Sequence, residues 1–463
     1  MQRDSLDFKN MSVGKLFTKQ LLPTILGMAA SALFTVVDGI FVGNGIGSDA
    51  LAAVNISAPL FMIITGLGLM FGMGGGILVS INLSRGKNKV ANINFTQSVT
   101  GVFFVSLVIT LMFTIFPEKV AVLLGSNEHL LDMVCEYLFW FSISLPVTVL
   151  VVALPFFIRL TNPKISMWAM LTATIMNITL DYVFIFIFEW GLFGAAIATD
   201  ISEAAGATIM IVYLFRKSIA VRFTRLKISA KSMLLTLRNV SYMMRLGFSV
   251  FMSEIAIAIM MIAGNFTFMK YLGADGVAAY SIVCYLFPII FMVFNATVQS
   301  AQPIISFNYG CGQMERSNRA LRLSMGFACC FAIIIMLTFT GFTSEIVSLF
   351  LPDKTNAAWQ YAVRGLPLFA TDYLFFGINI IMIGYYTSIE RLRRAILFTV
   401  MRVILPVVFF LLLPLWLEVT GVWLAIPAAD ITTSLVIMSF LIRDRVQKNG
   451  NTDKTYQRAL QSQ

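Results

Sequence analysis

The sequence predicts an all-α polytopic membrane protein: twelve transmembrane helices in two parallel-repeat six-helix lobes around a central cavity. Three observations lead to this fold class. Of the 463 residues, 58% are apolar and only 12% are charged, whereas about a quarter of the residues in soluble domains are charged. Apolar runs of about twenty residues, enough to cross a hydrocarbon core of roughly 30 Å, recur from end to end. Two parts of the chain also repeat each other at a constant spacing.

Twelve apolar segments are long enough to cross a bilayer. They lie near residues 17–43, 51–81, 94–116, 131–157, 166–188, 192–215, 240–268, 277–303, 320–343, 360–387, 394–416 and 420–442. An even number of crossings places both termini on one side of the membrane.

Lysine and arginine gather in alternate gaps between these segments. Of 33 basic residues, the side opposite the termini holds only Lys119, Lys270, Lys354 and Arg364. Because basic residues concentrate in cytoplasmic loops, we expect both termini in the cytoplasm. One miscounted helix would scramble this bias, so it also supports the number twelve. The net charge of +10 therefore reflects topology, and no nucleic-acid partner is expected.

The longest inner loop divides the chain into two halves. We expect an N-terminal lobe over 1–215, a cytoplasmic linker over 216–239, a C-terminal lobe over 240–442 and a cytoplasmic tail over 443–463. The linker is basic and amphipathic. We expect a solvated connector whose charge sets the orientation, and its composition also suits contact with anionic membrane lipid.

The two halves share sequence at an offset of 226 residues. "IGSDALAAVNI" (46–56) matches "LGADGVAAYSI" (272–282), and the same offset carries Ser80 and Asn82 onto Ser306 and Asn308. Both matches run in the same direction, so the repeat is parallel. Parallel repeats related by an axis along the membrane normal are a transporter architecture, in which two bundles rock about a central site.

Polar side chains interrupt three helices of the N-terminal half: Asp38 in the first, Asn177 and Asp181 in the fifth, and Thr199, Asp200 and Glu203 in the sixth. Ionisable residues within membrane helices usually mark an ion or substrate path, and Asn177 and Asp181, four apart, share a helix face. Two carboxylates in one dry pocket cannot both ionise cheaply, which suits proton uptake. The oxygens of Asp38, Asn177, Asp181 and Thr199 could instead bind Na⁺. Pro23 lacks a backbone donor and predicts a bend in the first helix.

The C-terminal half is less polar. Glu254 and Asp372 are the candidates for a substrate cavity, because acids among apolar side chains attract organic cations. Arg402 and Asp430 fall in the last two helices, and pairing of Glu254 or Asp372 with Arg402 as a structural contact is the alternative. The 26 methionines and 41 phenylalanines offer adaptable surface and ring faces for cations.

No phosphate loop, nucleophile with its base or metal-ligand spacing occurs in the sequence. The single histidine, His129, falls in an outer loop. We therefore expect no cofactor and no enzymatic activity, with an H⁺ or Na⁺ gradient as the energy source.

Four stretches together resemble the multidrug and toxic compound extrusion (MATE) family, and are most similar to its MepA-like bacterial branch. They are "VVDGIFVGNGIGSDALAAVNISAP", "NPKISMWAMLTATIMNITLDYVFIF", "GLFGAAIAT" and "SAQPIISFNYGCG". The resemblance implies a V-shaped pair of six-helix lobes in the bacterial cytoplasmic membrane. It also implies export of amphiphilic organic cations by antiport with H⁺ or Na⁺. Of these two coupling ions we expect H⁺, although the acids of both lobes leave Na⁺ open.

By motif position, the resemblance assigns the bending proline to Pro23 and the coupling network to Asp38, Asn177, Asp181 and Thr199. It assigns the acidic positions of the C-lobe cavity to Glu254 and Asp372. Asp200 and Glu203 add acidity beside Thr199 that departs from the family pattern, which leaves open which carboxylates couple. One chain supplies both lobes, so a monomer suffices.

Two other functions remain as alternatives. A lipid-linked saccharide flippase of the same superfamily carries an anionic headgroup and would need cavity arginines, for which Arg402 is the one clear intramembrane candidate. A membrane-embedded enzyme would need a metal cluster or an activated nucleophile.

Overall fold

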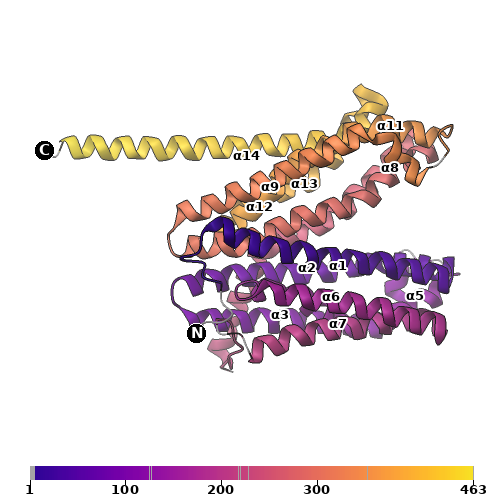
Figure 1. The fold of residues 1–463 in the computed structure, drawn as a ribbon, viewed down its shortest axis with the longest axis horizontal. Helices are drawn as coiled ribbons and strands as arrows, with labels where there is room; N and C mark the ends of the chain where they lie inside the picture. The colour runs from indigo at the N-terminus through magenta and orange to yellow at the C-terminus, as the bar shows by residue number, and fades with distance from the viewer. Residues whose placement is uncertain are drawn as a thin grey trace. The chain divides into compact units, whose positions relative to one another are not determined.

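The computed structural model describes residues 6–124, 126, 128–216, 218, 220–227, 229–351 and 353–461. Over these residues the chain forms α-helices, one π-helix and no strand (Figure 1). Residues 1–5, 125 and 127 of the predicted N-terminal lobe, 217, 219 and 228 of the predicted linker, 352 of the predicted C-terminal lobe, and 462 and 463 of the predicted tail lie outside the described residues.

The elements follow one another along the chain as α1 (Val13–Gly45), α2 (Ser48–Ser84), α3 (Asn88–Ile115), α4 (Pro117–Leu123), α5 (Leu131–Ile158), α6 (Pro163–Asp181), the π-helix η1 (Tyr182–Ile187), α7 (Gly191–Arg216), α8 (Ala230–Gly310), α9 (Met314–Gly341), α10 (Thr343–Phe350), α11 (Ala357–Ala370), α12 (Asp372–Ser388), α13 (Leu392–Leu412) and α14 (Pro414–Gln461).

The described residues contain twelve helical segments long and apolar enough to cross a membrane, which confirms the predicted number. The seventh and eighth segments, Ala230–Gly273 and Asp275–Gly310, both belong to α8 and meet at a break at Gly273. The tenth, Ala357–Ser388, consists of α11 and α12. The protein is therefore a multi-pass membrane protein.

The turns of the chain repeat as its sequence does. Gly47 and Gly86 have positive φ angles of 126° and 71°, and Gly273 and Gly312, each 226 residues later, have φ angles of 66° and 76°. Side chains other than glycine rarely adopt these angles. The second helix of each half thus begins and ends at equivalent glycines.

Packing divides the chain into two compact units. Unit 1 comprises Met1–Ile257, Pro288–Ser324 and Gly384–Arg393, and unit 2 comprises Ala258–Phe287, Met325–Ile383 and Arg394–Gln463. The boundaries of these units differ from those of the predicted lobes, because the units are defined by contacts between residues and the lobes by the sequence repeat.

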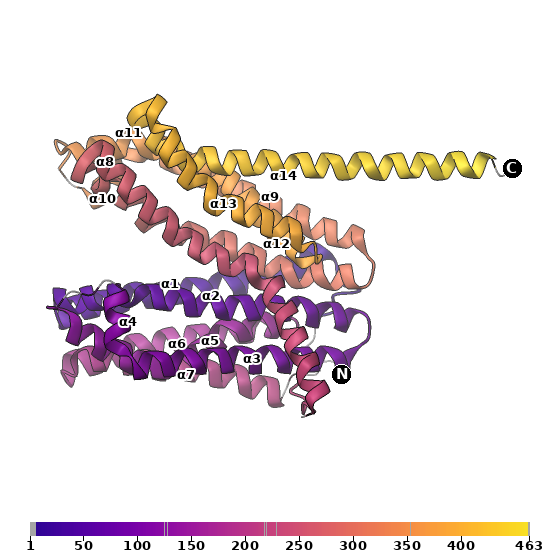
Figure 2. The same ribbon diagram turned by 180° about the vertical axis from the view of Figure 1, so that it is seen from behind.

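In unit 1, α1, α2, α3, α5, α6 and α7 run side by side as a bundle (Figures 1 and 2). The first part of α8 joins it through a close crossing with α2. A Cβ atom on Gly74 would lie 2.0 Å from the Met243 carbonyl oxygen, and one on Gly247 would lie 1.9 Å from that of Met70. The glycine-rich stretch of α2 therefore allows two backbones to touch.

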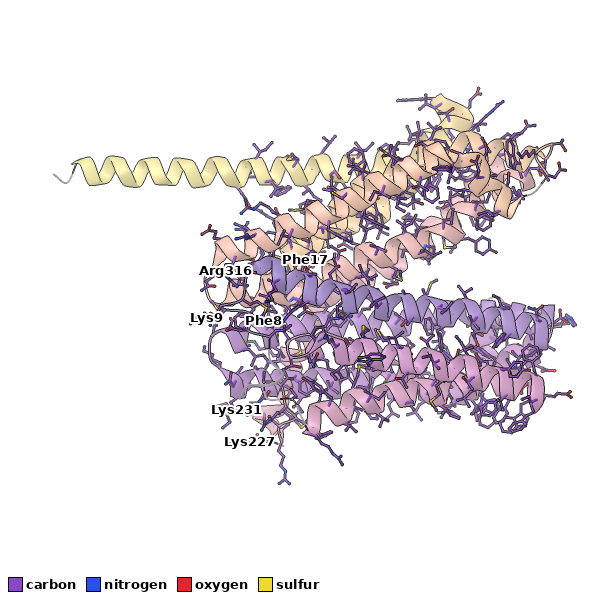
Figure 3. The ribbon with its side chains drawn as sticks, viewed as in Figure 1. Phe8, Lys9, Phe17, Lys227, Lys231 and Arg316 are labelled. Atoms are coloured by element: carbon purple, nitrogen blue, oxygen red, sulfur yellow. The ribbon has the colours of Figure 1, made fainter. Side chains whose placement is uncertain are left out.

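The segment before α1 is hydrogen-bonded to one end of unit 1. Arg316 of α9 donates from Nη2 to the carbonyl oxygens of Phe8 and Met11 at 2.9 and 2.6 Å, and Phe8 stacks on Phe307 (Figure 3). Hydrogen bonds from Asn10 hold the pKa of Asp7 below its ordinary value. Lys227 and Lys231 lie at this same end of the bundle.

Candidate functional site

A cavity of about 160 Å³ in unit 1 contains two of the predicted site residues. Asp38 lines it from α1 and Thr199 lines it from α7, while Ser57, Phe61 and Tyr137 contribute from α2 and α5. We name it the aspartate cavity. Among the described residues, Asp38 Oδ1 is buried without a hydrogen-bond partner.

Asn177 and Asp181 are fully buried on one face of α6, as their spacing predicts. Asp181 interacts electrostatically with Asp38. Within the described part of the chain, neither carboxylate oxygen of Asp181 has a donor in good hydrogen-bond geometry, and the Asn177 amide is a neutral group that interacts with this carboxyl. The π-helix η1 starts directly after Asp181, and π-turns are rare insertions that recur at functional sites.

Tyr137 of α5 is a site residue that the sequence did not single out. Its phenol interacts electrostatically with the carboxyl groups of Asp38, Asp181, Asp200 and Glu203. Its ring stacks on Phe141 with centroids 5.7 Å apart and ring planes 5° apart. Because a phenol is neutral, Tyr137 does not stand out among apolar residues as a carboxylate does, and no sequence pattern indicated a role for it.

A second cavity, of about 310 Å³, adjoins the first, since Phe34, Thr35 and Phe61 line both. Glu203 of α7 and Glu254 of α8 line this larger cavity. Glu203 is 8% exposed and accepts a hydrogen bond from Thr148. The predicted cavity residue Glu254 therefore shares a cavity with an acid of the N-terminal half.

The same cavity contains an arginine that falls in a predicted cytoplasmic gap, between the apolar segments 131–157 and 166–188. Arg159, directly after α5, is 2% exposed and lines the cavity, which we name the arginine cavity. Its Nη1 donates to Gln299 Oε1 at 2.5 Å, and Gln299 in turn donates to Asn295. Arg402 is therefore not the one buried arginine. The sequence does contain one indication of this site: Asn295, Gln299 and Gln302 are spaced four and three residues apart, so they form a polar face on an apolar helix.

In unit 2, Asp372 begins α12 in the middle of the tenth membrane segment and is fully buried. Arg402 Nε donates to Asp430 Oδ1 at 3.0 Å, and Asn379 also donates to Asp430. Asp372 interacts electrostatically with both Asp430 and Arg402. Asp430, for which the sequence predicted no role, is thus the hydrogen-bonded partner of Arg402.

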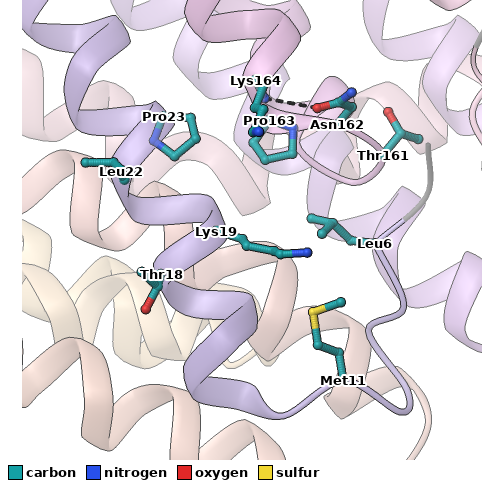
Figure 4. A pocket seen from close by; sticks show the side chains of 10 residues that line it. All are labelled: Leu6, Met11, Thr18, Lys19, Leu22, Pro23, Thr161, Asn162, Pro163 and Lys164. Atoms are coloured by element: carbon teal, nitrogen blue, oxygen red, sulfur yellow. Dashed lines mark hydrogen bonds between the residues drawn. The ribbon is translucent and has the colours of Figure 1, made fainter. Parts of the chain in front are cut away.

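Pro23 lies inside α1, which continues through it as a helix. Beside it is a cavity of about 500 Å³ that we name the lysine cavity, because Lys19 and Lys164 line it together with Pro23 (Figure 4). The Asn162 side chain caps α6 here by accepting a hydrogen bond from the Lys164 backbone at 3.2 Å. The proline therefore adjoins open space on the side facing α6.

Two bacterial proteins resemble the chain over nearly its whole length. It is 27% identical over 447 residues to multidrug export protein MepA of Staphylococcus aureus (strain bovine RF122 / ET3-1), which covers 95% of this chain and 96% of that protein. The protein of the same name from Staphylococcus saprophyticus is 25% identical over 444 residues, with the same coverage of each chain. Both are named as export proteins and not as enzymes.

Solved structures share the fold. A crystal structure of MATE in the bent conformation matches with a TM-score of 0.85 at 18% identity, over 96% of this chain and 99% of that chain. A MOP superfamily transporter from Pyrococcus furiosus, described as having a binding pocket of reverse polarity, matches with a TM-score of 0.83 at 19% identity, over 96% and 98%. The predicted fold class is confirmed.

The MatE family model matches residues 23–183 and 249–412. These two ranges make up more than half of the chain and correspond to the two predicted repeats. The match confirms the resemblance seen in the sequence motifs and the prediction of a transporter instead of an enzyme. This protein is a member of the MatE family.

Proposed function

We propose that this transporter exports amphiphilic organic cations by alternating access, in exchange for H⁺ entering from outside. The observation that carries the proposal is the pair of acids Asp38 and Asp181, drawn from α1 and α6 to one electrostatically coupled group beside the aspartate cavity. MepA, the relative from Staphylococcus aureus, is named a multidrug export protein.

The environment of Asp181 supports H⁺ over Na⁺ as the coupling ion. A deeply buried carboxylate beside a second acid is unfavourable when ionised, and Asp181 is fully buried beside Asp38 and the neutral amide of Asn177. Protonation removes this cost, so proton uptake would switch the group between two states. Na⁺ bound by Asp38, Asn177, Asp181 and Thr199 is the alternative coupling.

Acidic residues on the arginine cavity support a cationic substrate. Glu203 and Glu254 both line it, among apolar and aromatic side chains that suit an amphiphile. A lipid-linked saccharide flippase would use Arg159, but two glutamates on the same cavity would repel a purely anionic headgroup.

The lysines and arginines of the cytoplasmic gaps support a bacterial cytoplasmic membrane with both termini inside. We propose that the chain acts as a monomer, since one chain holds Asp38 and Asp181 together with the aspartate cavity and the arginine cavity.

Transport in liposomes tests the proposal. The purified protein is reconstituted, and ethidium movement is followed under a pH gradient alone or a Na⁺ gradient alone. We expect movement driven by the pH gradient and abolished in Asp38→Asn. The matched control is Asp132→Asn, which changes an exposed aspartate in the first turn of α5.

Ethidium movement driven only by a Na⁺ gradient would mean that the oxygens of the coupling residues bind Na⁺. These residues are Asp38, Asn177, Asp181 and Thr199. Unimpaired efflux by Asp38→Asn would refute the coupling role of Asp38. Absence of movement under both gradients would favour the flippase.

A further inference from the structure

Arg159 carries a buried charge that no carboxylate of the described residues pairs with. It is 2% exposed, and within the described part of the chain it makes no ion pair. Its hydrogen-bonded partner, Gln299, is a neutral amide. Its Nε has no acceptor among the described residues. An unpaired buried charge is costly, so this guanidinium lacks an anion.

The surroundings of Arg159 hold its side chain in place. Gln20 Nε2 donates to the Arg159 carbonyl oxygen at 2.6 Å, which fixes the backbone. The guanidinium carbon lies 5.3 Å from the centre of the Phe156 ring. Gln299 is itself fixed by its hydrogen bond to Asn295 at 3.2 Å. A guanidinium held this way is preorganised for a planar anion such as a carboxylate.

The charges on the arginine cavity limit what it can bind. Arg159, Glu203 and Glu254 all line it, so it presents one positive and two acidic groups. A ligand with only a cationic centre leaves Arg159 without an anion. A ligand with only an anionic group meets two glutamates. Both requirements are met by a molecule that has a cationic centre and an anionic group.

We propose that Arg159 binds an anionic group of the exported molecule and that the arginine cavity selects amphiphilic zwitterions, with a carboxylate beside the cationic centre. The inference rests on the proposed function, because it names the substrate class of the same cavity. At about 310 Å³, the cavity is at the lower end of the range that holds drug-sized ligands.

A matched pair of dyes isolates the anionic group. One is a rhodamine with a free benzoate, and the other is the methyl ester of the same rhodamine, so both carry the same cation. Binding to the purified full-length protein is measured by fluorescence anisotropy in detergent. We expect the wild-type protein to bind the acid more tightly than the ester. An inorganic anion bound at Arg159 would serve both dyes alike and produce no such difference.

Substitution of Arg159 should then affect one dye only. In Arg159→Gln we expect acid binding to weaken about tenfold or more, the effect of one charge-assisted contact, while ester binding changes less than about twofold. Retained ester binding also shows that the variant is folded. The control is Arg216→Gln, which removes an exposed arginine at the end of α7 and should leave the acid-to-ester ratio unchanged.

Gln299→Glu tests the same idea without removing the arginine. A carboxylate in place of the amide, 2.5 Å from Nη1, supplies the missing anion from within the protein. We expect this variant to lose its preference for the acid while it still binds the ester.

Two outcomes overturn the inference. Wild-type protein that binds the acid no better than the ester is one, and an equal loss of both dyes in Arg159→Gln is the other. Failure of the proposed function looks different, because the wild type would then discriminate the dyes in detergent but move neither across liposomes under a gradient.

Discussion

Gly247 of α8 is the position where a single methyl group should damage the arginine cavity without touching its lining. In Gly247→Ala the new Cβ atom would lie 1.9 Å from the Met70 carbonyl oxygen of α2, and real Cβ contacts are essentially never shorter than 3.0 Å. The two helices must therefore separate by about 1 Å, a strain of about 1–3 kcal/mol.

A second effect of the same substitution opposes the first. Alanine in a helix interior is favoured over glycine by roughly 0.5–1 kcal/mol. The clash exceeds this gain, because the atom that it meets is backbone, which cannot rotate away. We therefore expect Gly247→Ala to lower the melting temperature measured in detergent.

Gly247→Ala should also weaken ligand binding. Glu254 lies seven residues beyond Gly247 on α8, about 10 Å along the helix axis. Its Cβ lies 3.8 Å from where a Cβ atom on Gly66 of α2 would stand. Separation of α2 from α8 moves Glu254 away from the cavity, so dye binding should weaken together with stability.

Gly326→Ala is the matched control, because nothing lies within 4 Å of a Cβ atom at that position in the middle of α9. It makes the same chemical change and should leave the melting temperature unchanged or slightly raised. A Gly247→Ala protein with the wild-type melting temperature and dye affinity would refute the reasoning.

Three further substitutions test other parts of the protein. Tyr137→Phe keeps the ring that stacks on Phe141 and removes only the hydroxyl among the four carboxyls, so the pH profile of gradient-driven transport should shift at unchanged stability; an unshifted profile would exclude a role for the phenol. Arg402→Gln leaves Asp430 buried without its cation, which should cost about 3–5 kcal/mol. Combination with Asp430→Asn should restore most of the melting temperature, and no recovery would mean that the pair is not coupled. Pro23→Ala removes an interior proline that costs a helix about 3 kcal/mol, so α1 should become more stable and export slower; export at the wild-type rate would argue against bending at this position.

Membrane spans and repeats were predictable because a bilayer imposes few choices. The thickness of the hydrocarbon core sets the length of each apolar run, and the basic residues of the gaps fixed the number of crossings. The break in the tenth span is also visible in the sequence, where Asp372 interrupts an apolar run and becomes the first residue of α12. The repeat was exact enough that Gly47 and Gly273 both turn the chain with positive φ.

The composition of the cavities was only partly predictable. Asp38, Asn177, Asp181 and Thr199 stand out because a polar group in an apolar helix needs a reason. How these groups meet depends on packing between helices that lie far apart in sequence. Tyr137 joins the acids only because α5 packs between α2 and α7, and no local pattern carries that information.

The burial of Arg159 was not predicted from the sequence, for a physical reason. It follows directly after the last residue of α5, where the charge-counting rule assigns every arginine to the aqueous side. A long side chain at a helix end can reach either water or the protein interior. The choice depends on what the interior offers, which here is Gln299, 140 residues away in sequence.

Arg402 and Arg159, both buried among the described residues, show how a partner's charge separates a structural role from a binding role. Arg402 is 6% exposed and donates to the carboxylate of Asp430, so its charge is neutralised within the protein. Arg159 is buried more deeply, yet its hydrogen-bonded partner is the amide of Gln299. An amide orients a guanidinium without neutralising it, which keeps the arginine in place while its charge remains available. An arginine that served stability alone would gain more from a glutamate at position 299, so the glutamine there favours a role in binding.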